Sequence, residues 1–322
     1  MKIEIPADTR TPADPAVAST LLADYLHTQR ETILDGQITV ETHDDPDSVP
    51  GMVIAARRAR SALSAHRRTV RSEPEVRRLI EELRWFGINL GAAHELRTQS
   101  ARLHAAVDVL RPRYVRGPVN ARITEYFGER ARLAWVAARG LLGSPRFPTM
   151  IEDMMAEERL LRGGIVAGID DVDHEEVLSA LLERVRSRMR AIESAREEDA
   201  RDAAVHALRK AIRRTRYYLE SVHDLAPSRS TQACEGLKAV QDLLGEHQDA
   251  AVAKHHLIQI TRTAENAGES TFTYGLLLQR EIDLTTQCSV ALPAVYWRSL
   301  RDARVMADVE HIAISDRRRA GR

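Results

Sequence analysis

Residues 205–220 of this 322-residue chain read Val-His-Ala-Leu-Arg-Lys-Ala-Ile-Arg-Arg-Thr-Arg-Tyr-Tyr-Leu-Glu. The stretch contains neither glycine nor proline, and its apolar residues recur at helical spacing, so it predicts an α-helix. At about 100° per residue, one side of that helix collects an imidazole, a ladder of cations and a phenol, namely His206, Arg209, Lys210, Arg213, Arg216 and Tyr217. Because cations aligned on one helix face repel one another, an anionic partner is expected on this side.

A second copy of the stretch lies in the first half of the chain. The motif Arg-Arg-x-Arg begins at Arg57 and again at Arg213, 156 residues later. The dipeptide Leu-Gly ends at Gly91 and again at Gly245, 154 residues later. Seven places before each of these glycines stands a basic residue, Arg84 in the first copy and Lys238 in the second. Landmarks in the same order and at nearly the same separation indicate an internal duplication.

The second copy carries a longer pattern. His-x-x-Arg-x-x-x-Arg-Arg-x-Arg starts at His206, and a basic residue, Leu-Gly and Asp249, four places after the glycine, follow. This pattern resembles the CHAD family, the conserved histidine α-helical domain, and the resemblance extends from about residue 15 to about residue 310. It implies an all-α fold of two similar antiparallel helical-bundle halves, related by internal duplication, with a basic central channel. It also implies binding of inorganic polyphosphate.

The first copy departs from the family pattern. Pro50 stands where the histidine is expected, Val53 where the first arginine is expected, and Ile54 opposite the lysine. After Leu-Gly, the family's Arg-Asp pair is replaced by His94-Glu95. These differences remove cations from one half of the expected site.

Glycines and prolines between residues 140 and 148 mark the main break in the chain. Within each half we expect helices to end near Gly36, at Gly91, at Gly245 and before Pro293. The predicted organisation is a flexible arm (1–14), a divergent first helical half (15–145), a linker (146–172), a second helical half (173–310) and a basic tail without fixed structure (311–322).

Charge is segregated along a chain whose net charge is zero. Residues 51–72 hold six arginines and no acid, whereas residues 152–176 hold nine acids. Segregation concentrates a local field, which favours a confined anion site over a broad nucleic-acid surface, so nucleic-acid binding should be weak or absent. Cys234 and Cys288 lack the spacing of a metal site or a disulfide framework.

The sequence lacks a long apolar run and a signal-peptide core, so no membrane association is expected. We therefore expect a cytoplasmic protein and, by analogy with the family, one found at polyphosphate granules. No cofactor and no metal are expected, because the histidines and cysteines do not follow metal-ligand spacings.

Arginine presents paired donors to a phosphate, and lysine acts as a compact point charge. Cations one helical turn apart, about 5.4 Å, can follow a phosphate chain along a helix. The residues expected to bind polyphosphate are Arg57, Arg58, Arg60, Arg84, His206, Arg209, Lys210, Arg213, Arg214, Arg216 and Lys238.

Three other interpretations stay open at this point. The cations could form an ordinary solvated face paired with the acidic segments. The chain could be a helical protein-interaction module with a degenerate phosphate site, a hypothesis that the weakened first copy favours. An enzyme acting on polyphosphate would need a carboxylate cluster beside the arginines and is not expected, since P-loop, Gly-x-Ser-x-Gly and Cys-x-x-Cys motifs are missing.

Overall fold

The computed structural model describes residues 15–66, 73–163, 174–225 and 227–320. All regular structure within these ranges is helical, which confirms the predicted fold class. In chain order the α-helices are α1 (Pro15–His43), α2 (Val49–His66), α3 (Glu73–Asp108), α4 (Val119–Leu142), α5 (Arg146–Arg162), α6 (His174–Ser194), α7 (Glu198–Ser221), α8 (Pro227–Asn266) and α9 (Phe272–Ala320). Short 3₁₀ turns η1 (Pro46–Ser48), η2 (Pro112–Tyr114) and η3 (His223–Leu225) lie between them.

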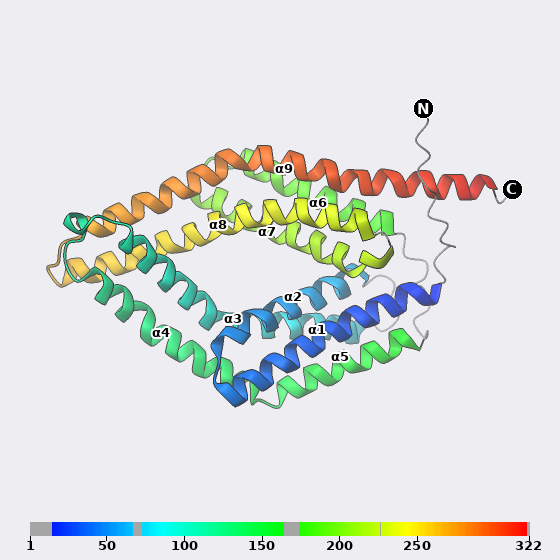
Figure 1. Ribbon diagram of the computed structural model, residues 1–322, viewed down its shortest axis with the longest axis horizontal. Helices are drawn as coiled ribbons and strands as arrows, with labels where there is room; N and C mark the ends of the chain where they lie inside the picture. The colour runs from blue at the N-terminus through cyan, green and yellow to red at the C-terminus, as the bar shows by residue number, and fades with distance from the viewer. Residues whose placement is uncertain (1–14, 67–72, 164–173, 226, 321–322) are drawn as a thin grey trace.

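Two helical bundles lie one above the other and meet at one end (Figure 1). In the lower bundle α2 packs against both α1 and α3, and α5 packs on α1. In the upper bundle α7 packs in the same way between α6 and α8. The pair α3–α4 thus corresponds to the pair α8–α9, which are also packed together. A duplication would produce this recurrence, and the duplication itself stays a prediction.

Three separate apolar cores hold this arrangement together. One joins α1, α2, α5, the first part of α3 and the end of α4, around buried Leu26, Met52 and Phe86. A second joins α6, α7 and the adjoining parts of α8 and α9, around Leu208 and Tyr218. The third packs the end of α3 and the start of α4 against the end of α8 and the start of α9. Because the third core contains both halves, it fixes the two bundles to each other at the end where they meet.

The expected helix ends at glycines are wrong. The structure has α1 continuing past Gly36, α3 past Gly91 and α8 past Gly245. Gly36 lies so close to the Met52 side chain that a Cβ would sit 2.3 Å from its Cγ. These glycines permit close packing of neighbouring helices, and the helix backbone continues because an isolated glycine costs only about 1 kcal/mol. Pro293 likewise lies inside α9.

The predicted linker 146–172 is wrong for residues 146–162, which form α5. Phe147, Met150 and Leu161 from this helix are buried in the first core, so α5 belongs to the first bundle. The predicted unstructured tail is helical as far as Ala320, since no glycine or proline interrupts the chain between Pro293 and Gly321. The predicted arm 1–14 and the remaining linker residues 164–172 lie outside the described residues.

Candidate anion-binding site

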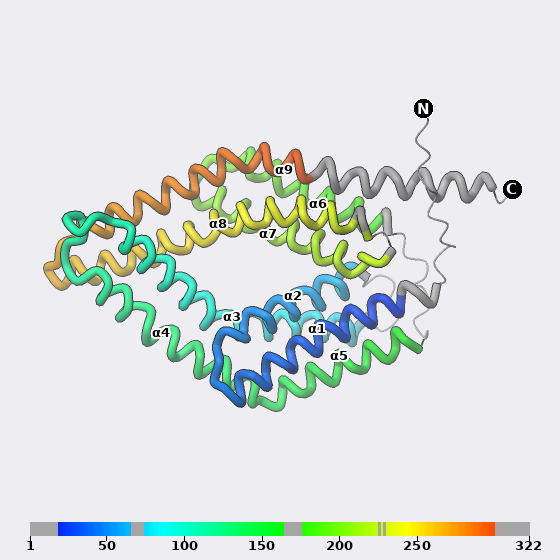
Figure 2. Tube along the Cα trace, in the orientation of Figure 1, coloured from blue at the N-terminus to red at the C-terminus, as the bar shows by residue number. Residues whose placement is uncertain are grey.

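Helices α2 and α7 face each other between the two bundles and are in contact (Figure 2). The Ser61 hydroxyl of α2 donates to the carbonyl oxygen of Arg214 on α7, at 3.4 Å. This contact places the arginine motif of the first copy beside that of the second. The surface formed by the two helices is where the predicted phosphate ligands lie.

Six cations from three helices lie within electrostatic reach of one another, and we call them the central cation cluster. Its members are Arg57 and Arg60 on α2, Arg84 on α3, and Arg209, Lys210 and Arg213 on α7. The structure thus brings together six of the residues predicted from the sequence.

Burial and mutual repulsion act on this cluster in the same direction. Burial, followed by the charge of Arg57, lowers the pKa of Arg213 to about 10. The pKa of Arg60 is lowered by burial and then by Arg57 and Arg84. The pKa of Lys210 is lowered by burial and then by Arg213 and Arg60. Both effects disfavour the charged forms, so the cluster costs free energy in the absence of an anion.

Within the described ranges, no carboxylate bonds the centre of the cluster, and the charges of Glu95 and Glu81 act on Arg57 and Arg60 without a direct contact. No ion pair or side-chain hydrogen bond involves Arg57, Arg60, Lys210 or Arg213 there. Arg84 makes one exposed contact, 3.3 Å to Glu81. An ordinary solvated face would show these cations paired with acids, so this interpretation does not describe the centre.

Arg209 shows most directly that the site lacks a partner. Its Nε is buried and has no hydrogen-bond partner among the described residues. The side chain lies flat against α8 at Gly245, where a Cβ would be 3.7 Å from Nη2 and 3.8 Å from Nε. In the first copy the equivalent Gly91 instead meets Val53, at 3.7 Å. In each half the glycine lets a side chain of the neighbouring helix approach the backbone. This side chain is Val53 in the first half and the cation Arg209 in the second.

At the other end of α7 a carboxylate neutralises the cations. Glu220 receives a hydrogen bond from Arg58 Nε at 3.0 Å, and its Oε1 lies 3.2 Å from Arg216 Nη1. The Tyr25 hydroxyl on α1 lies 3.5 Å from its other oxygen. Both arginines also lie over the ring of Tyr217, at 5.7 and 4.9 Å. We call Arg58, Arg216 and Glu220 the Glu220 triad.

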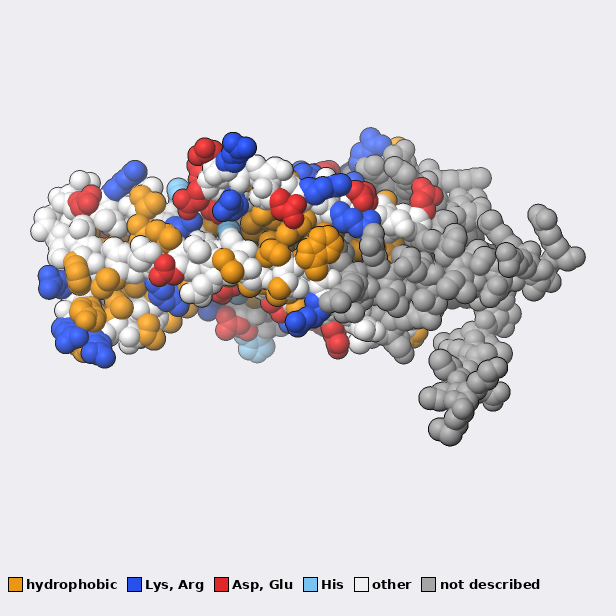
Figure 3. Space-filling view, turned by 90° about the horizontal axis from the view of Figure 1, so that it is seen from above, with side chains coloured by type: hydrophobic (Ala, Val, Ile, Leu, Met, Phe, Trp, Pro, Cys, Tyr) orange, Lys and Arg blue, Asp and Glu red, His pale blue; other side chains and the backbone are white. Residues whose placement is uncertain are grey.

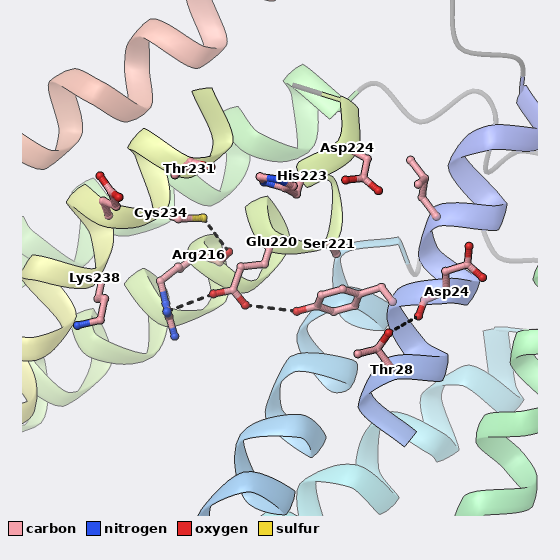
Figure 4. A pocket seen from close by; sticks show the side chains of 13 residues that line it. Asp24, Thr28, Arg216, Glu220, Ser221, His223, Asp224, Thr231, Cys234 and Lys238 are labelled. Carbon is pink, nitrogen blue, oxygen red and sulfur yellow. Dashed lines mark hydrogen bonds and ion pairs between the residues drawn. The ribbon is translucent and has the colours of Figure 1, made fainter. Parts of the chain in front are cut away.

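Arg216 and Glu220 of the triad line a pocket of about 520 Å³ between α1, α7 and α8. Figure 4 shows Glu220 and Arg216 pointing toward each other on α7, with Lys238 on the neighbouring helix. The Lys238 ammonium lies 2.6 Å from the Asp242 carboxylate on its own helix. Three predicted ligands, Arg58, Arg216 and Lys238, therefore already have carboxylate partners.

His206 lies beside the cluster rather than within an acid pair. Its Nδ1 is 2.8 Å from Oε1 of Gln248 on α8. Burial, followed by the charge of Lys210, lowers its pKa below the ordinary value of 6.5. The lowered pKa favours the neutral ring, whose single N–H is donated from Nδ1 to Gln248, so the imidazole can donate to an anion through Nε2 only when it is protonated.

A carboxylate flank borders the cluster where α3 meets α8. The pKa of Asp249 is raised, first by burial and then by Glu95, while Arg209 and Arg102 oppose the shift. Gln99 from α3 donates to Glu95 at 3.5 Å and to the Asp249 carbonyl oxygen at 3.3 Å. In the described part of the chain, no group of three or more histidine, cysteine or acidic residues has the geometry to hold a metal ion.

The outer face shows a different charge pattern. Basic and acidic side chains are interspersed on the face seen in Figure 3. On α6, for example, Arg190 lies 2.6 Å from Glu183. The central cation cluster is therefore a local feature of the space between the bundles.

Two residues of the site were not predicted from the sequence, Glu220 and Tyr25. Glu220 stands four residues after Arg216, a spacing at which opposite charges pair on a helix, so it was detectable. Its bond to Arg58 across the bundles, and the approach of Tyr25, depend on tertiary structure alone.

These features define a class: an all-helical, two-bundle protein with an uncompensated cation cluster between the bundles. A family model described as the CHAD domain matches residues 24–258. The chain belongs to the CHAD domain family.

Two solved structures have the same fold. PptA from Streptomyces chartreusis superposes with a TM-score of 0.70, at 19% identity, over 87% of this chain and 99% of its own. The CHAD domain from the plant Ricinus communis gives a TM-score of 0.65 at 22% identity, over 86% of this chain and 90% of its own.

Among curated proteins the chain resembles the uncharacterized proteins MT2285 and Rv2226 of Mycobacterium tuberculosis. Each is 31% identical over 298 residues, which is 90% of this chain and 54% of the relative. The chain thus spans about half the length of these relatives. Among its described helices none has the length and apolar character needed to cross a membrane.

Proposed function

We propose that this protein binds inorganic polyphosphate, without turning it over, through the central cation cluster. One observation carries the proposal: six cations from α2, α3 and α7 converge, and those at the centre have no acidic partner among the described residues. Uncompensated buried charge is costly, so its presence favours an anionic ligand.

The shape of the cluster favours a chain of phosphates over a single ion. Its members lie on three helices, and Arg60, Arg84 and Lys210 continue the positive surface away from Arg57 and Arg213. A linear polyanion matches such an extended set, because each phosphate can meet a different guanidinium or ammonium group. Polyphosphate is also the ligand that the family resemblance implies.

The test is a titration of the purified protein with long-chain polyphosphate at several salt concentrations, with single-stranded DNA as competitor. Wild-type protein should bind tightly, with log affinity falling linearly as log salt rises. The double variant Arg57→Gln/Arg213→Gln should lose about 100-fold or more in affinity, because two charge-assisted contacts are removed.

The matched control is Arg186→Gln/Arg190→Gln, which removes the same charge from α6, where both arginines pair with Glu183. It should bind nearly as well as wild type. Equal losses in both variants would refute the site. No binding by the wild type at low salt would refute the function and leave the helical interaction module as the alternative.

Two companion measurements follow from the same proposal. Polyphosphate incubated with the protein and Mg²⁺ should release no inorganic phosphate, and steady release abolished by Arg213→Gln would show an enzyme instead. A fluorescent fusion should collect at polyphosphate granules in cells, whereas the Arg57→Gln/Arg213→Gln fusion should stay dispersed.

A further inference from the structure

The two ends of the cation line on α7 differ in how they are compensated. At one end Lys210 is exposed, and neither it nor Arg60 has an ion-pair partner among the described residues. Arg84 extends the same end, with its side chain 59% exposed and only the 3.3 Å contact to Glu81. This end presents accessible positive charge that a phosphate chain can reach from solvent.

The opposite end is occupied by a carboxylate. Glu220 is held by Arg58 at 3.0 Å, by Arg216 at 3.2 Å and by the Tyr25 hydroxyl at 3.5 Å, and its side chain is only 20% exposed. The carboxylate thus engages one N–H of each arginine, while Nε of Arg216 is buried and has no hydrogen-bond partner among the described residues. A phosphate that advanced to this point would meet its negative charge and compete for donors already bonded.

Two residues equivalent to cations of the Lys210 end differ from them. Ile54 stands at the position corresponding to Lys210 in the other copy, and its side chain is 39% exposed. Lys238, which corresponds to Arg84, is paired with Asp242 at 2.6 Å. The Lys210 end therefore has two cations, Lys210 and Arg60, without an ion-pair partner among the described residues, and Arg84 in one exposed contact to Glu81. At the Glu220 end, Arg58 and Arg216 share one carboxylate and Lys238 is paired with Asp242.

We propose that the site is open at the Lys210 end and closed by Glu220, so that it receives the terminal segment of a phosphate chain instead of letting the chain pass through. This inference rests on the proposed function and adds the part of the ligand that is bound. Glu220 is the specificity residue: it touches no phosphate and ends the cation line. A chain terminus has neighbours on one side only, so it can occupy the closed end where an internal phosphate cannot.

The test is the number of protein molecules bound per polyphosphate chain, measured by calorimetry with chains of short, medium and long length. The wild type should saturate at one protein per chain end, whatever the length. A stoichiometry that rises in proportion to length would overturn the proposal, because it would show binding along the interior of the chain.

Two variants open the closed end. Glu220→Gln removes the blocking charge, and Glu220→Gln/Ile54→Lys also supplies the missing cation. In both, the number bound should rise with chain length, and the double variant should bind long chains more tightly than wild type. If neither variant responds to chain length, Glu220 does not close the site and the assignment fails.

The control is Glu183→Gln, which removes another glutamate paired with two arginines, on α6. It should keep the wild-type stoichiometry. Thermal midpoints of all variants establish that each is folded, and the partly exposed position of Ile54 favours tolerance of lysine. Absence of any polyphosphate binding by the wild type would refute the proposed function and this inference together, whereas binding along the chain would refute this inference alone.

Discussion

The buried and half-buried arginines of this protein include two groups with opposite surroundings. Away from the site they have carboxylate partners: Arg30 Nε lies 2.8 Å from Glu158, and Arg102 Nη2 lies 2.7 Å from Glu281. Hydrogen bonding to Glu158 raises the pKa of Arg30. These pairs connect α1 to α5 and α3 to α9, so each stabilises contacts between helices that the fold requires.

The central arginines lack this compensation. Burial and then repulsion from Arg57 lower the pKa of Arg213, and no ion pair involves either residue in the described part of the chain. The same chain therefore pairs arginines where helices are joined, including Arg58 of α2 with Glu220 of α7, and leaves Arg57 and Arg213 unpaired at the centre of the space between α2 and α7. The central cluster therefore lowers the free energy of unfolding, a trade-off that is typical of functional sites.

The largest effect is expected from breaking a paired arginine. Glu281 is fully buried and bonds Arg102 at 2.7 and 3.0 Å. Glu281→Gln should reduce the free energy of unfolding by about 3–5 kcal/mol, because it leaves a buried guanidinium undercompensated. Urea denaturation measures the loss. A change below about 1 kcal/mol would mean that Glu246, the other partner of Arg102 at 2.8 Å, suffices.

In the central cation cluster, a substitution is expected to change the free energy of unfolding in the opposite direction. Arg213→Gln should raise the free energy of unfolding by about 1–3 kcal/mol, because it removes a charge whose pKa the fold depresses to about 10. Added polyphosphate should raise the thermal midpoint of the wild type and not that of Arg57→Gln/Arg213→Gln, since only a bound ligand stabilises the folded state. Destabilisation by Arg213→Gln would show that the central arginines stabilise the fold, so that they would not differ from the paired arginines in this respect.

The buried acids Glu157 and Glu158 also differ in whether they have a partner. Glu157 is 4% exposed, and its Oε1 has no hydrogen-bond partner among the described residues, whereas its neighbour Glu158 bonds Arg30. Burial, followed by the charge of Glu75, raises the pKa of Glu157 to about 7. The folded state then binds a proton that the unfolded state has released, so stability falls as pH rises from about 4.5 to about 7.

Glu157→Gln should remove that fall and add about 1–3 kcal/mol near pH 8. Thermal midpoints between about pH 5 and pH 8 measure it. Glu158→Gln is the matched comparison and should destabilise at every pH in this range, because it breaks the bond to Arg30. Parallel pH profiles for Glu157→Gln and wild type would contradict the shifted pKa.

The central cluster could be predicted from the sequence because helical periodicity fixes its geometry. Spacing of three and four residues places Arg209, Lys210 and Arg213 together on one helix, and the repeated Arg-Arg-x-Arg motif adds Arg57 and Arg60 from another. The all-helical fold followed from the family pattern. That two helices would face each other with like charges was not deducible from periodicity, which is local.

Helix ends and ion pairs could not be predicted from local sequence patterns. Gly91 and Gly245 have the local signature of a helix end, yet each permits a close contact with the neighbouring helix, to Val53 and to Arg209. Arg58 has the same sequence context as its neighbours, but a carboxylate 162 positions away neutralises it. Both outcomes depend on which helices meet, and this information is not local.

The smallest expected effect is a pH dependence of polyphosphate affinity that arises from His206. In the free protein its pKa lies below 6.5 because of burial and then the charges of Lys210, Arg209 and Arg213. A bound polyanion offsets those cations and raises the pKa, so the complex takes up a proton. Affinity should therefore increase as pH falls through the region between the bound and free pKa values.

The gain should be a few-fold, below the tenfold change that corresponds to a pKa shift of about one unit. Calorimetry in two buffers of different ionisation enthalpy measures the proton uptake directly. His206→Gln should abolish the part of the uptake that belongs to the imidazole, while His104→Gln, whose ring contacts Asn120 and Thr124 away from the cluster, should leave it unchanged. Equal uptake by wild type and His206→Gln would show that polyphosphate does not reach the imidazole. The bound segment would then be confined to Lys210, Arg213 and the cations of α2 and α3.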